Sequence, residues 1–572
     1  MASASLDRLL SELEESKRRF GKSDRERTSE LLDRIGRRRF ADAESLIRFH
    51  ESLLFVRAHS QSAKVLRRAE RLLDTFAARV SRLRASGVDM TPFDYIESSG
   101  IVGTVITGTF SFRIAHWLAT RYASRADIDW DRYEKKERLA NTLPRIIPLL
   151  YEDTLVEANI PYLEWLHAAR GRGRRDLKWI VEGIDRLSLS EREKAELYDS
   201  LELPVRWDLG ETSASRTLNA RKVKKVFYHR APFIRRSEVS LADELRSPVD
   251  LKPLTLSKGK AVLDMVREAT TVRYRELYGI TNGDPESVVR ADVGRGVEIF
   301  LWGLPAERRL PLRAYHAGFT LKNGVPINYI EGITLFERME VGFNTFYTFR
   351  EGESAWVYAK VLAALNRVAG ATCFSVDPYQ LGFNNYEAIE SGAFWFYRKM
   401  GFRPTDPELL ELTEREEKKL AADSSYRTSA RTLRRLSEKS AIYEMDESRR
   451  GDWDRFHVRN LGLAVQRRLR ERFGGDAGRI QKAAMRAVGR ALGFRADEIK
   501  GPELCAFSKL ALVLALIPDL NRWTDKEKKD LRRIIRAKMG RDESVYARLL
   551  IKHSKLRDSI INSGRWPVVS DQ

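Results

Sequence analysis

The residues best suited to chemistry lie at 340–369, where a strand pattern, a short turn and a helix pattern follow one another. Residues 340–349 are rich in aromatic and β-branched types, which predicts a strand. The Arg-Glu-Gly sequence at 350–352 predicts a turn, and an apolar helix pattern begins at 354. A strand that passes through a glycine turn into a helix directs several backbone N–H groups and the helix dipole at one point. We therefore expect an anion site here, suited to a pyrophosphate.

A second pattern follows directly, at 371–402. Residues 371–379 predict a short buried strand that ends at Pro378. The residues after it indicate a loop, then a helix, and a stop at Gly401. The whole stretch therefore predicts the order strand, turn, helix, strand, helix.

This order, with the residues at its joints, resembles the coenzyme-binding half of the GNAT acyltransferase superfamily. In that superfamily the turn reads Arg/Gln-x-x-Gly-x-Gly/Ala and holds the pyrophosphate of coenzyme A, and the matching residues here are 349–354. The last helix of the family reads Asn-x-x-Ala-x-x-x-Tyr-x-Lys-x-Gly-Phe, which the chain matches at Ala393, Tyr397, Lys399, Gly401 and Phe402. Glu390 stands at the asparagine position. The resemblance covers a small part of the chain, and the flanking regions resemble no family.

The resemblance implies a role for each of these residues. Tyr397 would be the general acid, whose phenol protonates the departing thiolate. Glu340 would be the general base that accepts a proton from an amine, with Glu331 and Glu337 as rivals. The residues that would hold the coenzyme are Tyr347, Thr348, Phe349, Arg350, Glu351, Gly352, Glu353, Ser354, Ala355 and Asn385.

Each of these residues also has a simpler explanation. Glu351 and Glu353 put two carboxylates where phosphates would bind, and at roughly 6 Å and a dielectric constant of about 20 to 80 each repulsion costs about 0.7–3 kcal/mol. Acidic residues at a helix start also stabilise the helix dipole. Tyr397 fits a role in packing its helix on the sheet, and Glu340 fits an exposed bend with ordinary salt bridges.

Composition narrows the class of protein. The chain has 572 residues, of which 43% are hydrophobic and 10% aromatic, as in globular proteins of several domains. Cys373 and Cys505 stand far apart and the histidines lack metal-ligand spacing, so we expect neither a disulfide scaffold nor a bound metal. No apolar run reaches roughly 18–20 residues, and the start of the chain lacks a signal core. We therefore expect a cytoplasmic protein without a membrane span.

The net charge of +21 favours polyanions as partners. Basic clusters at 170–178, 221–230 and 526–541 are the candidates for contact with RNA or another polyanion. Basic and acidic residues nevertheless interleave along most of the chain, which also fits an ordinary solvated surface.

Three functions remain open from the sequence. The first is a GNAT-type acyltransferase that moves an acyl group from acyl-CoA, such as acetyl-CoA, to an amine acceptor. The second is an aminoacyl-tRNA-dependent transferase of the Fem-like type, which has a related fold and no coenzyme site. The third is a non-catalytic GNAT-like module in a polyanion-binding or scaffolding protein.

The elements that must position these residues divide the chain into five parts. Helical periodicity predicts an all-helical domain at 1–205, followed by a basic connector at 206–255. Alternating strand and helix patterns predict the GNAT-like domain at 256–405. A polar connector at 406–450 and a basic helical domain at 451–572 complete the chain.

We thus predict an α+β fold. Its centre is a GNAT-like mixed β-sheet flanked by helices, and the Asn323-Gly324 pair marks a hairpin within that sheet. A large all-α region precedes the sheet and a smaller all-α region follows it.

Overall fold

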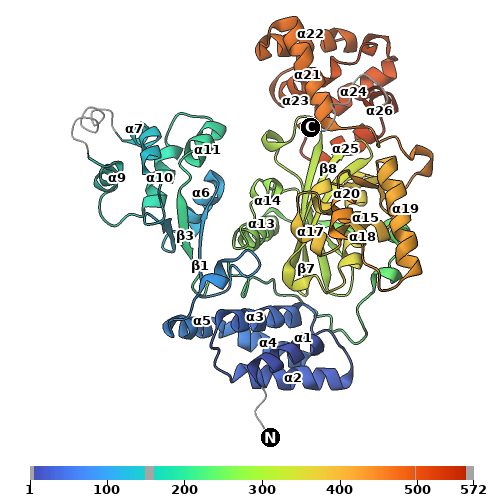
Figure 1. Ribbon diagram of the computed structural model, residues 1–572. Coiled ribbons are helices and arrows are strands. Elements are labelled where there is room, and N and C mark those ends of the chain that lie inside the picture. The colour runs from blue at the N-terminus through green and yellow to red at the C-terminus, as the bar shows by residue number, and fades with distance from the viewer. Residues whose placement is uncertain (1–4, 148–159, 496–497, 562–572) are drawn as a thin grey trace. The chain divides into compact units, whose positions relative to one another are not determined.

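The structure is a computed structural model that describes residues 5–147, 160–495 and 498–561 (Figure 1). Residues 148–159 and 562–572, in regions predicted to be helical, lie outside the described residues. The chain forms two compact units. Unit 1 consists of Met1–Pro232, Ala261–Thr281 and Lys322–Pro326, and unit 2 consists of Phe233–Lys260, Asn282–Leu321 and Ile327–Gln572.

Unit 1 begins with five helices whose apolar residues recur at helical spacing. Leu9, Leu10 and Leu13 of the first helix are fully buried, while the residues between them are polar and reach solvent. The five are α1 (Leu6–Ser16), α2 (Lys22–Gly36), α3 (Ala43–Ala58), α4 (Ala63–Asp74) and α5 (Phe76–Ala85).

The rest of unit 1 combines further helices with a small antiparallel sheet. The helices are α6 (Phe112–Arg121), α7 (Leu143–Ile146), α9 (Tyr162–Arg170), α10 (Asp176–Asp185), α11 (Glu191–Asp199), most of α13 (Leu256–Thr271) and α14 (Tyr278–Thr281). The sheet has the order β1-β3-β2 and is formed by β1 (Val105–Thr109), β2 (Ala126–Ile128) and β3 (Pro204–Asp208).

This small sheet differs from the all-helical prediction for 1–205. Its strands have only three to five residues, too few for a period of two to stand out in the sequence. Tertiary packing stabilises these strands, because Trp207 of β3 is fully buried in a cluster that also contains residues of α6 and α10.

Unit 2 is built on a nine-stranded mixed sheet with the order β11-β12-β10-β9-β8-β7-β6-β5-β4. β9 and β10 pair in parallel, and β8 and β9 pair antiparallel. The strands are β4 (Leu251–Pro253), β5 (Val289–Asp292), β6 (Val297–Trp302), β7 (Ala314–Lys322), β8 (Val325–Leu335), β9 (Arg338–Thr345), β10 (Cys373–Val376), β11 (Arg403–Pro404) and β12 (Ala441–Glu444). The predicted α+β class, with a central mixed sheet and helical regions before and after it, is confirmed.

The predicted hairpin signal is also confirmed. Asn323 and Gly324 connect β7 to β8 with φ angles of 48° and 81°, the left-handed conformation of a two-residue hairpin turn. A Cβ atom added to Gly324 would lie 2.0 Å from the carbonyl oxygen of Arg221, so this position requires glycine.

Unit 2 also contains helices beside the sheet and a helical region that follows it. The long apolar helix α15 (Ser354–Ala369) connects β9 to β10 and packs on β6, and it ends at Gly370, which has a φ of 79°. The others are α12 (Leu241–Arg246), α16 (Pro378–Leu381), α17 (Tyr386–Glu390), α18 (Ala393–Lys399), α19 (Pro407–Ala422), α20 (Ala430–Leu436), α21 (Val458–Phe473), α22 (Ala477–Leu492), α23 (Gly501–Leu514), α24 (Asp525–Lys538), α25 (Glu543–Ile551) and α26 (Ser554–Ile561).

Two strands of the large sheet lie in segments that were predicted to be connectors. β12 lies within 406–450 and pairs with both β10 and β11, and β4 lies within 206–255 and pairs with β5. Both are short and carry polar residues, so only their hydrogen-bonded neighbours reveal them as strands.

Within the described residues, no helix is both long enough and apolar enough to cross a membrane.

Candidate functional site

The candidate site of unit 2 begins where two parallel strands separate. β10 pairs with β9 through Cys373, Phe374 and Ser375, and it ends one residue later. Asp377 then caps the short helix α16, which carries the chain away from the sheet. β9 continues to Thr345, so its backbone beyond Glu340 leaves the register with β10.

The side chain of Gln380 takes over hydrogen bonding to this part of β9. Its Nε2 donates to the carbonyl oxygen of Val341 at 3.2 Å, and its Oε1 accepts from the amide of Phe343 at 3.3 Å. One primary amide thus forms the pair of bonds that a neighbouring strand residue would form. These two backbone groups of β9 are therefore engaged by an amide side chain in place of a neighbouring strand.

Tyr397 reaches the same position from α18. Its hydroxyl donates to Oε1 of Gln380 at 3.2 Å, and its ring packs edge-on against Tyr358 and Phe402. Only 5% of the residue is exposed, and burial raises the pKa of its phenol above the usual value of 10. The side chain of Gln380 thus lies between the Tyr397 hydroxyl, which the sequence suggests as a general acid, and the backbone of β9.

Glu331 lies on the other side of β9 from Gln380. It stands opposite Gly342 in the β8–β9 register, and a Cβ atom added to Gly342 would lie 3.5 Å from both Gln380 and Glu331. Burial raises the pKa of Glu331, and the hydrogen bond donated by the hydroxyl of Tyr315 offsets part of that rise. Glu331 is therefore a more basic carboxylate than an exposed glutamate, and it lies beside the point where the strands separate.

Glu340 lines a cavity of about 770 Å³ in the same unit. Its side chain is 39% exposed and lies 4.0 Å from a guanidinium nitrogen of Arg313. Basic, aromatic and apolar residues form most of the remaining wall, including Arg338, Trp453 and His457. Ile333 of β8 also lines this cavity, and Glu331 shares its face of the sheet because side chains alternate along a strand.

Glu337, the third candidate base, has a structural role instead. Its carboxylate accepts hydrogen bonds from the guanidinium of Arg557, at 2.7 and 2.9 Å from Nε, and from the indole of Trp453 at 2.9 Å. Burial raises its pKa, but these bonds more than reverse that effect, so the pKa lies below the ordinary value. Glu337 is thus an ionised anchor that ties β9 to α26.

The predicted phosphate turn is compact and largely bonded to itself. The 3₁₀ turn Tyr347–Phe349 leads into it, and the amide of Gly352 donates to the carbonyl oxygen of Phe349 at 3.0 Å. The guanidinium of Arg350 lies 4.0 Å from the centre of the Tyr347 ring and pairs with Glu387, which also accepts from the Tyr347 hydroxyl at 2.7 Å. The amide of Gly352 is therefore engaged within the turn, so an anion would meet the amides that follow it.

Glu353 does not face the position of the expected phosphates. It is 3% exposed, pairs with Arg295, and accepts a hydrogen bond from the amide of Ile234 at 3.2 Å. The charge that the sequence appeared to set against phosphate is thus neutralised inside the protein, and Glu351 alone is exposed beside the turn.

The first turn of α15 follows this loop. Ser354 donates its hydroxyl to the carbonyl oxygen of Arg350 at 3.2 Å, and Ala355 is buried. Among the described residues no side chain caps the N-terminus of α15. Asn385, by contrast, caps α17 by accepting from the amide of Ala388 at 3.2 Å.

The structure thus brings together Tyr397, Gln380 and Glu331 around Gly342 of β9. Glu340 lies on β9 as well, two residues before Gly342. Sequence reasoning did not identify Gln380, and it named Glu331 as a rival of Glu340. The only sequence signal for Gln380 was its place two residues after the Asp377-Pro378 turn that ends a buried strand.

No cluster of three or more histidine, cysteine or acidic side chains in the described part of the chain could hold a metal ion. Comparisons with known protein families, with curated proteins and with solved structures find no match for this chain.

Proposed function

We propose that unit 2 carries the site of a GNAT-type N-acyltransferase that moves an acyl group from acyl-CoA to an amine. The observation that carries this proposal is the edge of β9 at Val341 and Phe343, which hydrogen-bonds an amide and is flanked by a phenol and a basic carboxylate. The same strand leads into the uncapped N-terminus of α15.

The donor suits this edge because the pantetheine arm of coenzyme A carries two amides in an extended chain. Those amides would replace the amide of Gln380 on the backbone of Val341 and Phe343. The pyrophosphate of the same molecule would then lie near the first turn of α15, where the helix dipole favours negative charge. Glu353 would not oppose it, because Arg295 neutralises its carboxylate.

The reacting groups would then have defined roles. The nitrogen of the acceptor amine bonds to the thioester carbon, the carbon–sulfur bond breaks, and the amine proton passes to Glu331. Tyr397 protonates the thiolate that leaves. Glu331 suits the base because burial raises its pKa, whereas Glu340 lies in the wider cavity and would orient the acceptor.

A second candidate is the non-catalytic module, and the position of Gln380 favours it. This side chain occupies the β9 edge that the donor would need, and Tyr397 is almost fully buried behind it. Burial raises the pKa of Tyr397. That rise widens its gap from the ordinary thiol pKa of about 8.5 and makes the phenol a poorer donor to a thiolate.

The experiment that separates these functions measures acetyl-CoA binding by thermal shift and titration calorimetry in the full chain and in Gln380→Ala. An acyltransferase binds acetyl-CoA in both, at least as tightly in the variant, because the variant no longer needs to vacate the edge. Binding only in Gln380→Ala would identify the natural chain as a non-catalytic module with a filled site.

Absence of binding in both proteins would refute the acyl-CoA proposal. Copurified RNA with a steep salt dependence would then favour the aminoacyl-tRNA-dependent transferase or a polyanion-binding role. In proteins that bind, release of free coenzyme A in the presence of amines tests turnover.

A further inference from the structure

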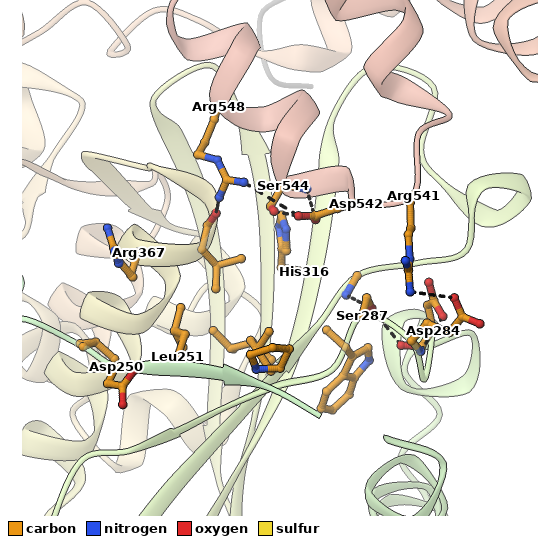
Figure 2. Close-up of a pocket in the computed structure, with 18 residues that line it drawn as sticks. Asp250, Leu251, Asp284, Ser287, His316, Arg367, Arg541, Asp542, Ser544 and Arg548 are labelled. Atoms are coloured by element: carbon orange, nitrogen blue, oxygen red, sulfur yellow. Dashed lines mark hydrogen bonds and ion pairs between the residues drawn. The ribbon is translucent and has the colours of Figure 1, made fainter. Parts of the chain in front are cut away.

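Unit 2 contains a second cavity, of about 690 Å³, that is distinct from the β9 edge. Its floor comes from β5, β6 and β7, and its wall comes from the last turn of α15 and the start of α25 (Figure 2). A volume of this size lies within the range of natural small-molecule sites. None of the residues assigned to the acyltransferase site lines it.

His316 of β7 lies at the base of this cavity. The residue is 3% exposed, and its Nδ1 is a buried atom without a hydrogen-bond partner among the described residues. A buried polar atom that is left unbonded costs free energy, and such atoms are rare in folded proteins. The imidazole is directed at the cavity because its strand neighbour, Tyr315, faces the opposite side of the sheet toward Glu331. A ligand in the cavity would supply the missing bond.

The imidazole is surrounded by charges that keep it neutral. Burial lowers the pKa of His316 to about 4, and Arg548, Lys538 and Arg309 act in the same direction, while Asp542 partly opposes them. At neutral pH the ring therefore has one donor and one acceptor nitrogen. Its best ligand partner is a hydroxyl group, which can pair with either nitrogen.

Two of the acidic residues that line the cavity are paired with bases. Asp250 lies 3.1 Å from the ammonium of Lys252, and Glu286 lies 3.7 Å from the guanidinium of Arg541. These carboxylates bring little uncompensated negative charge to the cavity.

The carboxylates of the other two acidic residues, Asp542 and Asp284, accept hydrogen bonds from residues that follow them closely in the chain. Asp542 caps α25 by accepting from the amide and hydroxyl of Ser544, at 2.8 and 2.6 Å, and Asp284 accepts from the amide of Glu286 at 2.9 Å. Because the hydroxyl of Ser544 donates to Asp542, the Ser544, His316 and Asp542 group shown in Figure 2 does not form a nucleophile activated by histidine.

Of the three arginines that line the cavity, Arg541 pairs with Glu286, Arg548 lies 3.9 Å from Asp542, and Arg367 remains. It is an exposed residue at the end of α15, it lines the cavity, and its guanidinium pairs with none of the described residues. A guanidinium binds a carboxylate through two parallel hydrogen bonds, which makes a carboxylate the natural complement. The cavity wall also includes the apolar side chains of Val289, Leu301 and Trp302.

We propose that this cavity binds a small organic carboxylate that also carries a hydroxyl group. Its carboxylate pairs with Arg367, its carbon skeleton packs on Leu301 and Trp302, and its hydroxyl bonds to the imidazole of His316. Because the cavity shares no residue with the β9 edge, this inference does not depend on the acyltransferase proposal.

The test uses ligand-observed NMR and titration calorimetry on the full chain at neutral pH. The probes are hydroxybutyrate, hydroxyphenylpropionate and longer hydroxylated acids, each with its primary amide and its analogue without the hydroxyl. We expect at least one hydroxy acid to bind at least tenfold more tightly than its amide and severalfold more tightly than its deoxy analogue.

Two variants assign these preferences to residues. Arg367→Gln should abolish the preference for carboxylate over amide, and His316→Leu should abolish the preference for the hydroxylated probe. Arg431→Gln, an exposed arginine of α20 outside the cavity, serves as the matched control and should bind as the natural chain does. Binding should also change the imidazole ¹⁵N signals of His316 in the natural chain, a readout that does not require a variant to fold.

The proposal is overturned if no hydroxy acid binds better than its amide. It is overturned equally if Arg367→Gln retains that preference while circular dichroism shows a folded protein, or if the His316 signals do not move at saturation.

Discussion

The neutral, buried imidazole of His316 makes a measurable contribution to the dependence of stability on pH. In the unfolded chain a histidine has a pKa near 6.5, whereas burial lowers the pKa of His316 in the folded protein to about 4. Between these two values the unfolded state binds more protons than the folded state. The free energy of unfolding must therefore fall as the pH drops from about 6.5 toward 4, and this loss is absent above pH 6.5.

The size of the effect follows from the two pKa values. Proton linkage gives a loss of about 2 kcal/mol at pH 5 and about 3 kcal/mol at pH 4, relative to pH 7.5. Other buried groups also titrate in this range, so the contribution of His316 is best isolated by comparison with His316→Gln. That variant should lose about 2 kcal/mol less than the natural chain between pH 7.5 and pH 5.

Urea denaturation monitored at both pH values measures the difference, and Val289→Ala provides the control. Val289 lines the same cavity and does not titrate, so its variant should be less stable at both pH values but show the pH dependence of the natural chain. The reasoning would be refuted if His316→Gln and the natural chain lost equal stability. A direct NMR titration that placed the His316 pKa near 6.5 would refute it as well.

Four further substitutions test other parts of unit 2. Gly370→Ala should destabilise the fold by about 1–2 kcal/mol, because its φ of 79° disfavours any side chain, and thermal unfolding would measure this. Glu337→Ala should cost about 3–5 kcal/mol, because it leaves Arg557 buried without its main partner; a change below 1 kcal/mol in urea denaturation would contradict the anchoring role. If acetyl-CoA turns over, Glu331→Gln should lower kcat by about 10²–10⁴-fold with the fold intact, and Tyr397→Phe should also lower kcat. Unchanged steady-state rates in both would remove these residues from the chemistry.

Several features of the fold could be predicted from the sequence because they depend on neighbours in the chain. The Asn323-Gly324 turn follows from the left-handed φ angles that a tight hairpin demands. The helix after Gly352 follows from a long run of apolar helix formers that stops at Gly370. These signals are local, and the structure contains both elements.

Other features escaped prediction because distant segments decide them. β12 has only four residues, and its place between β10 and β11 is set by hydrogen bonds to strands far away in the sequence. The small sheet of unit 1 escaped for the same reason.

In the candidate site, too, residue types could be predicted from the sequence, whereas their contacts depend on distant segments. The sequence indicated Tyr397 and the carboxylates near β9, but it could not show which of them would be buried or bonded. Glu353 illustrates this limit, since its partner Arg295 lies 58 positions earlier in the chain and removes the repulsion expected from its charge. The role of Gln380 was equally hidden, because an amide side chain that acts as a strand residue has no sequence signature.

The anchor between Glu337 and Arg557 has a consequence for how the protein is made. The two residues are 220 positions apart, so a ribosome releases the start of β9 long before it adds the arginine. Until then Glu337 has no counter-charge from α26, and its burial beside Trp453 would be unfavourable. We expect the part of the sheet around Glu337 to remain unfolded until α26 has been synthesised. Chaperones could bind this part of the nascent chain during that time.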